Sequence, residues 1–129
     1  MKYPLSKSDI DIKSKSGKSI DQITIDEVIN GRVTGEDIKI SKETLRLQGE
    51  IARQEGRTQL GENFERASEL VDIPDEELLI IYNMLRPNRS TKEEILNKAK
   101  EIRDKYNAIA CSNLIMDAVN VYSKRGILK

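Results

Sequence analysis

Apolar side chains recur at helical spacing through the middle of the chain. They predict one helix over residues 42–55, with Ser41 as its N-cap, and a second over residues 58–71, because residues three and four apart share one face of a helix. Gly49 lies inside the first helix at a cost of about 1 kcal/mol relative to alanine, so either the helix tolerates it or another segment packs closely there. The apolar residues are Leu45, Leu47, Ile51 and Ala52 in the first helix and Leu60, Phe64, Ala67 and Val71 in the second.

Residues 78–85 are apolar on nearly all sides, which predicts a helix that is buried on most sides. Proline suits the first position of a helix, so Pro74 marks its start, and the acidic residues 75–77 complement the helix dipole. Pro87 ends the helix, because the residue before a proline is biased away from helical backbone angles.

Two capping boxes predict further helix starts, since a hydroxyl at the N-cap and a glutamate three residues later satisfy backbone N–H groups that have no partner in the helix. The first box, residues 24–27, opens a short helix. The second, residues 90–93, opens a long helical pattern toward the C-terminus. This pattern is one helix or two, and Asn107 and residues 112–113 are the candidate breaks.

The chain shows no internal repeat and no convincing strand, so the predicted fold is an all-α domain of about four to six helices over residues 21–129. Residues 1–20 differ in composition, because five lysines face two aspartates and give a net charge of +3. The whole chain balances 22 basic against 22 acidic residues, so the remainder carries −3. We interpret residues 1–20 as an extended N-terminal arm, with a frayed tail as the alternative.

Composition limits the chemistry of this 129-residue chain more than it limits the fold. The chain has no histidine and so lacks the commonest general base near neutral pH and the commonest metal ligand. Its one cysteine, Cys111, cannot form an internal disulfide or a thiolate metal cluster. Zero net charge gives no overall attraction to nucleic acid, and no apolar run approaches the ~20 residues of a membrane span. The N-terminus also lacks the apolar stretch of a secretory signal, so we expect a cytoplasmic protein.

The short motifs that suggest chemistry all have simpler explanations. Residues 17–19 spell Gly-Lys-Ser, like the end of a phosphate-binding loop, but Ile12 stands where that motif needs a glycine. Cys111 has apolar neighbours and no histidine to activate it, so we expect a buried packing residue and not a nucleophile. Arg86, Arg89 and Lys92 form a small basic cluster without interleaved aromatic residues, which favours a solvated turn or an acidic partner over nucleic acid. The residues therefore predict no catalytic, cofactor-binding or metal site.

What remains is a helical domain with an arm and one helix that is too apolar for a single small helical layer to cover. Extended arms and unusually apolar helices are common in obligate heteromers, whose interfaces are large and hydrophobic. We therefore expect a protein partner, with a stable monomer as the alternative.

The ordered blocks of the sequence resemble the small subunit of adenosylcobalamin-dependent glycerol and diol dehydratases. The most specific block covers residues 73–90 and contains the segment Ile-Tyr-Asn-Met-Leu-Arg-Pro at 81–87. The other matching blocks lie at residues 3–5, 17–18, 23–28, 31–33, 37–45, 48, 51–52, 63–67, 69–70, 121–122 and 128, so the resemblance spans nearly the whole chain.

The resemblance implies a heterohexamer with two copies each of a large, a medium and a small subunit. It implies that the large subunit is a TIM barrel that holds the substrate and that adenosylcobalamin lies between the large and medium subunits. A radical from the cofactor abstracts hydrogen from glycerol or a 1,2-diol, which then loses water and becomes an aldehyde. The small subunit is implied to be a helical piece clamped on the large subunit that supplies no catalytic residue, cobalt ligand or substrate contact.

On this basis we expect Tyr82, Met84 and Leu85 to lie in the core or at a subunit boundary. The candidate residues of the subunit interface are Tyr3, Pro4, Leu5, Phe64, Tyr82, Arg86 and Arg89.

The position of the first matching block bears on the substrate. Diol dehydratases packaged in protein microcompartments usually carry an additional N-terminal extension on this subunit, whereas here the matching block begins at Tyr3. We therefore expect a glycerol dehydratase, which converts glycerol to 3-hydroxypropionaldehyde and water, with a propanediol (diol) dehydratase as the alternative. A hypothesis of a different class is an independent helical adaptor or regulatory module that is not associated with an enzyme.

Overall fold

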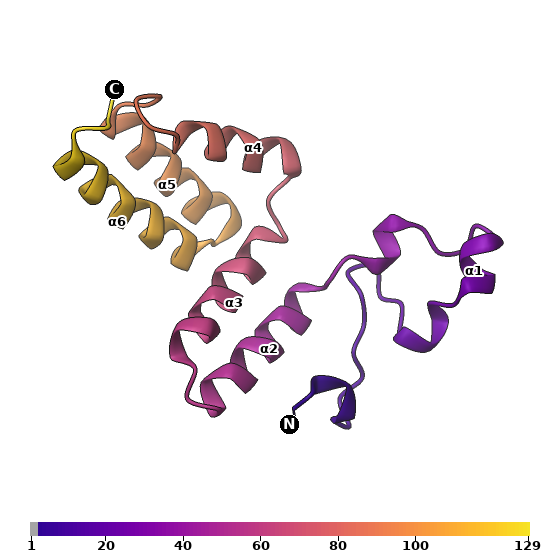
Figure 1. Ribbon diagram of the computed structural model, residues 1–129. Coiled ribbons are helices and arrows are strands. Elements are labelled where there is room, and N and C mark those ends of the chain that lie inside the picture. The colour runs from indigo at the N-terminus through magenta and orange to yellow at the C-terminus, as the bar shows by residue number, and fades with distance from the viewer. Residues whose placement is uncertain (1–2) are drawn as a thin grey trace. The chain divides into compact units, whose positions relative to one another are not determined.

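The computed structural model describes residues 3–129, so residues 1 and 2 of the predicted arm lie outside the described part. The described residues contain six α-helices, three short 3-10 helices and only isolated β-bridges (Figure 1), which confirms the all-α class. Two compact units divide the chain, Met1–Ser68 and Glu69–Lys129. The helices are α1 (Ile25–Ile29), α2 (Lys42–Gln54), α3 (Thr58–Leu70), α4 (Asp75–Met84), α5 (Lys92–Tyr106) and α6 (Ile109–Arg125).

Part of the segment predicted to be an arm is hydrogen-bonded to residues near the start of α2. The Lys15 N–H donates to the Lys39 carbonyl at 2.8 Å, and the Thr44 hydroxyl donates to the Lys13 carbonyl at 3.3 Å. Leu5, in the first 3-10 helix, is 3 % exposed. These residues therefore pack within the first unit, and contact of the arm with a partner stays a prediction.

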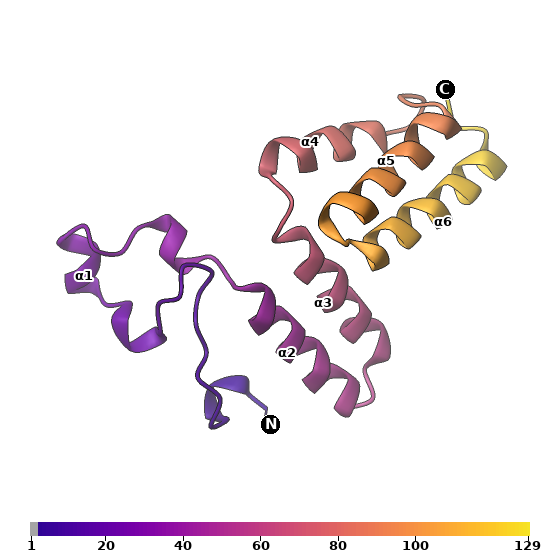
Figure 2. The same cartoon turned by 180° about the vertical axis from the view of Figure 1, so that it is seen from behind.

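Helices α2 and α3 lie side by side as an antiparallel hairpin (Figures 1 and 2), and two glycines set their separation. A Cβ atom on Gly49 would lie 3.1 Å from the Phe64 Cβ and 3.2 Å from the Gly61 carbonyl oxygen. A Cβ atom on Gly61 would lie 2.7 Å from the Arg53 Cγ and 3.1 Å from the Gly49 carbonyl oxygen. Of the two explanations for Gly49, the close approach of another segment is therefore correct.

In the second unit, α5 and α6 form a helical hairpin, and their inner faces make the core together with Ala108 between them, Ile81 of α4 and Ile73 just before α4. Asn107, with φ of 54°, adopts the left-handed conformation between them, so the long C-terminal pattern is two helices. Thr91, and not Ser90 as predicted, caps α5 by accepting from the Glu94 N–H at 3.2 Å. The buried core residues are Ile73, Ile81, Ile95, Ala99, Ile102, Ala108, Cys111, Ile115 and Val119, which confirms Cys111 as a packing residue.

The first turn of α6 is capped by a residue from the end of α3. The N-cap residue of α6, Ala108, offers no side-chain oxygen. Instead the Glu69 carboxylate accepts from the Ala110 N–H at 2.9 Å and from the Cys111 N–H at 2.7 Å. Glu69 is only 8 % exposed. Both hydrogen bonds are charge-assisted, and the negative carboxylate lies at the positive end of the helix dipole. Glu69 therefore stabilises the start of α6.

Helix α4 is fixed to α5 by a small polar cluster. The Tyr106 hydroxyl donates a hydrogen bond to the Glu77 carboxylate. The Lys98 Nζ lies 3.3 Å from the Glu77 Oε1. The hydrogen bond from Tyr106, helped by Lys98, holds the pKa of Glu77 below its ordinary value of 4.5. The same bond raises the pKa of the Tyr106 hydroxyl. Both partners of the ion pair are largely shielded, with side-chain exposures of 15 % for Lys98 and 14 % for Glu77.

Gly61→Ala is expected to destabilise the chain although alanine favours a helix by about 1 kcal/mol, because the added methyl group overlaps Arg53 and crowds α2. Urea unfolding should give a free energy of unfolding about 1 kcal/mol lower than wild type. Gly35→Ala is the matched control, since its Cβ meets nothing within 4 Å. An equal or higher stability for Gly61→Ala would contradict the close packing of the hairpin.

Glu69→Ala should cost about 2–3 kcal/mol, because it leaves two N–H groups at a buried helix start without an acceptor. Glu62→Ala, which removes an exposed glutamate from the same helix, should change stability by less than about 0.5 kcal/mol. Thermal and urea unfolding of the two variants measure the difference. Equal stability of both variants would show that the cap contributes nothing.

The Glu77 cluster predicts a pH effect. Because the pKa of Glu77 is lower in the folded chain, its stabilisation is present above the ordinary value of 4.5 and is lost as pH falls through the lowered folded value. Tyr106→Phe removes the main cause of this shift. Wild type should therefore exceed Tyr106→Phe in stability at neutral pH, and the gap should shrink as the pH falls below 4.5 and through the lowered folded pKa of Glu77. The control Tyr82→Phe, at an exposed site, should show a difference that does not depend on pH.

Candidate interaction surfaces

Helix α4 is covered on one side only. Ile81 is 9 % exposed and faces the core, whereas Leu79, Ile80 and Tyr82 are 63 %, 53 % and 65 % exposed. The prediction that this helix is buried on most sides is therefore wrong for the chain by itself. The physical reason is that the second unit covers α4 with the α5–α6 hairpin alone, a single layer. We call Leu79, Ile80 and Tyr82 the α4 face.

The residues around the α4 face differ in how far they are buried. Leu85 is half-buried and packs against the core, which confirms its placement there. Met84 is half-buried as well, and its placement in the core or at a subunit boundary stays a prediction. Tyr82 lies outside the core, so its placement at a subunit boundary stays a prediction. Arg86 and Arg89 are both exposed in the turn that follows α4.

Helix α1 in the first unit carries a second group of exposed apolar side chains, which the sequence analysis missed. No residue of this five-residue helix is buried. Ile25, Val28 and Ile29 occupy positions i, i+3 and i+4, a spacing that indicates one apolar helix face. The helix is too short for this spacing to stand out in the sequence. We call the exposed apolar side chains of this helix the α1 patch: Ile25 is 79 %, Val28 54 % and Ile29 75 % exposed.

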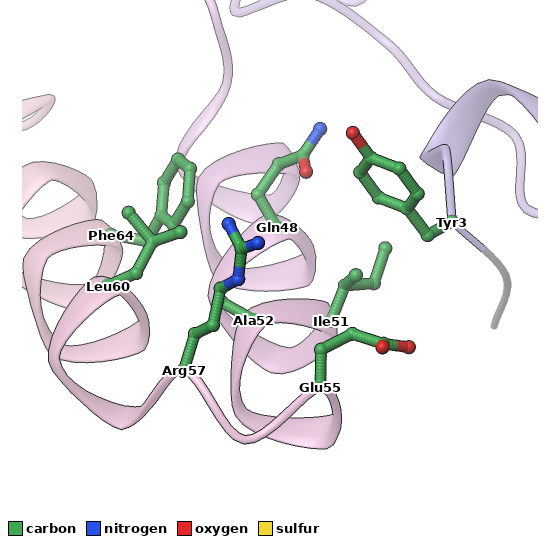
Figure 3. Close-up of a pocket in the computed structure, with 8 residues that line it drawn as sticks. All are labelled: Tyr3, Gln48, Ile51, Ala52, Glu55, Arg57, Leu60 and Phe64. Carbon is green, nitrogen blue, oxygen red and sulfur yellow. The ribbon is translucent and has the colours of Figure 1, made fainter.

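A half-open hollow of about 750 Å³ brings two of the predicted interface residues together. Tyr3, from the N-terminal segment, lies across the hollow from Phe64 of α3 (Figure 3), and Arg57 extends into the space between them. Tyr3 is 76 % exposed, whereas Leu5 packs inside the unit. The full lining is Tyr3, Gln48, Ile51, Ala52, Glu55, Arg57, Leu60 and Phe64.

The seven predicted interface residues thus fall into two sets. Tyr3, Pro4, Leu5 and Phe64 belong to the first unit, and Tyr82, Arg86 and Arg89 belong to the second. Pro4, like the two arginines, is exposed.

The described residues offer surfaces and little chemistry. Within residues 3–129, no three histidine, cysteine, aspartate or glutamate side chains gather in a way that could hold a metal ion. The Cys111 thiol is buried. None of the helices in this part of the chain has the length and apolar character needed to cross a membrane.

Comparison with known proteins identifies the family of the chain. The dehydratase small subunit family matches residues 1–129. The propanediol dehydratase small subunit of Salmonella typhimurium is 43 % identical over 128 residues, which cover 98 % of this chain and 74 % of that protein. The propanediol dehydratase small subunit of Citrobacter freundii is 42 % identical over the same shares of both chains. The chain therefore belongs to the dehydratase small subunit family and is a subunit of a dehydratase that has larger partner subunits.

Proposed function

We propose that this chain is the non-catalytic small subunit of an adenosylcobalamin-dependent diol dehydratase and that it stabilises the larger subunits. The observation that carries the proposal is the match over nearly the whole chain to two propanediol dehydratase small subunits. Family membership argues against an independent adaptor module.

The same observation changes the preferred substrate. The expectation of a glycerol dehydratase depended on the early position of the block at Tyr3, whereas identities of 43 % and 42 % connect the chain to subunits named for propanediol. We therefore propose 1,2-propanediol as the main substrate of the complex, ahead of glycerol.

The residues of this chain do not fit the cofactor. A corrin needs a large, enclosed site, and the hollow beside Tyr3 is half-open and lined by four apolar side chains together with Tyr3, Gln48, Glu55 and Arg57. The chain also has no histidine to offer to cobalt. We place the cofactor, the radical reaction and the substrate pocket on the larger subunits, in a heterohexamer with two copies of each chain.

The exposed members of the predicted interface set fit a contact with those subunits. Tyr3 and Tyr82 each expose most of an aromatic ring, and aromatic residues are enriched at protein interfaces. Arg86 and Arg89 add cations beside Tyr82 in the sequence, and arginine is enriched at interfaces as well.

Omitting this chain tests the proposal. The large and medium subunits expressed without it should be less soluble or turn over 1,2-propanediol more slowly with adenosylcobalamin, and co-expression with this chain should restore both properties. A two-subunit preparation with full solubility and full activity would contradict the structural role. A higher kcat/KM for glycerol than for 1,2-propanediol in the three-subunit complex would contradict the proposed substrate.

A further inference from the structure

The end of helix α1 places an asparagine directly before a glycine. Asn30 is the C-cap residue of the helix, and Gly31 follows it in the left-handed conformation with φ of 76°. The Gly31 N–H donates to the Val28 carbonyl at 3.1 Å, and the Arg32 N–H donates to the Glu27 carbonyl at 2.9 Å. These two bonds form a Schellman motif, in which glycine is the usual left-handed residue. No other asparagine in the sequence is followed by glycine.

An asparagine before a glycine is the pair most open to attack by the main chain on the side-chain amide. The main-chain nitrogen of the glycine bonds to the asparagine Cγ, the bond from Cγ to the side-chain nitrogen breaks, and ammonia leaves with the main-chain proton. Water then opens the resulting succinimide ring at either carbonyl, which yields aspartate or isoaspartate. Water is the sole co-reactant. A side chain on the following residue would crowd the attacking nitrogen, and glycine has none.

The surroundings of this pair give the reaction access. Asn30 and Gly31 are both exposed, so hydroxide and water reach them. Helix α1 has five residues and buries none of them, and a helix end without buried contacts opens at little cost in free energy. Opening releases the Gly31 N–H from the Val28 carbonyl and lets the main chain of Asn30 turn its Cγ toward the Gly31 nitrogen. The Schellman motif therefore slows the attack but does not block it.

We propose that Asn30 is a site of spontaneous deamidation, converted to aspartate and isoaspartate through a succinimide with Gly31. Isoaspartate carries the main chain through its side-chain methylene and so adds one main-chain atom directly after the helix. Beyond that point, the N–H groups of Arg32 and Val33 both donate to the Glu27 carbonyl, at 2.9 and 3.2 Å. The added atom displaces both groups from this acceptor. Val33 is 4 % exposed, so the change loosens the attachment of α1 to a buried residue.

The first test compares two asparagines within one sample. The full-length chain is kept at mildly alkaline pH in heavy-oxygen water, and peptides that contain Asn30 or Asn88 are followed by mass spectrometry. Asn88 is the internal control, because it is also exposed in a turn but is followed by Arg89. Asn30 should convert at least tenfold faster, with one heavy oxygen per converted site and more isoaspartate than aspartate. The rate should rise in proportion to hydroxide concentration, because the attacking nitrogen must lose its proton.

The matched variant is Asn30→Gln, whose longer side chain would have to close a six-membered ring and therefore reacts far more slowly. Its peptide should take up no heavy oxygen at position 30, while Asn88 converts as it does in wild type. Equal rates for Asn30 and Asn88 in wild type would show that the folded turn protects Asn30, and would overturn the proposal. Loss of Asn30 without uptake of heavy oxygen would also overturn it, because water must open the succinimide.

The second test measures the structural consequence by hydrogen exchange. The Arg32 and Val33 amides should exchange with deuterium at least tenfold faster in the isoaspartate form than in the fresh chain. The Ala110 amide of the second unit, which donates to Glu69, should exchange at the same rate in both.

Asn30→Asp separates the effect of the new charge from that of the added main-chain atom. This variant keeps the normal main chain, so Arg32 and Val33 should stay as protected as in the fresh wild-type chain. Equal exchange of these two amides in the fresh and isoaspartate forms would overturn the proposed loosening of α1.

Discussion

The second unit depends on how the first turn of α6 is satisfied. Ala108 cannot cap that turn, and the nearly buried carboxylate of Glu69 accepts from two of its N–H groups instead. Buried N–H groups left without an acceptor would cost more than an ordinary hydrogen bond contributes. Helix α6 forms with α5 the core that α4 packs against, so the Glu69 carboxylate at the end of α3 supports the core on which α4 rests.

The distribution of apolar residues distinguishes this chain from a self-sufficient domain. A chain of this size that divides into two units has a high ratio of surface to interior, and each unit can cover few of its apolar side chains. The α4 face and the α1 patch are the result, because neither α4 nor α1 has a second layer within its own unit. The apolar residues that would complete a core in a larger domain are here available to other chains.

The local features of the fold could be predicted from the sequence, because caps and helix breaks act within a few residues. Ser41 caps α2 as predicted, and Asn107, one of two candidate breaks, separates α5 from α6. The features that could not be predicted from the sequence depend on residues that are distant along the chain. The partner of Glu69 lies 41 residues further along the chain, so no local pattern indicates it. The close approach at Gly49 could be raised as an alternative, but only the placement of Gly61 decides it.

The candidate interaction surfaces could likewise be predicted only in part. The sequence identified α4 as too apolar for its surroundings, but it could not say which side the α5–α6 hairpin covers. It named Tyr82 and Arg86 as interface residues but not the exposed Leu79 and Ile80, because periodicity alone does not distinguish an inward from an outward face.

The exposed α4 face has a consequence for the life of the chain before assembly. A newly made copy exposes Leu79, Ile80 and Tyr82 to water. Chaperones and proteases recognise exposed apolar segments of this kind, and aggregation competes for them. Excess small subunit is therefore expected to be removed, while assembled copies escape. The same three side chains that would hold the complex together would then keep the number of small subunits matched to the number of large ones, without a dedicated regulator.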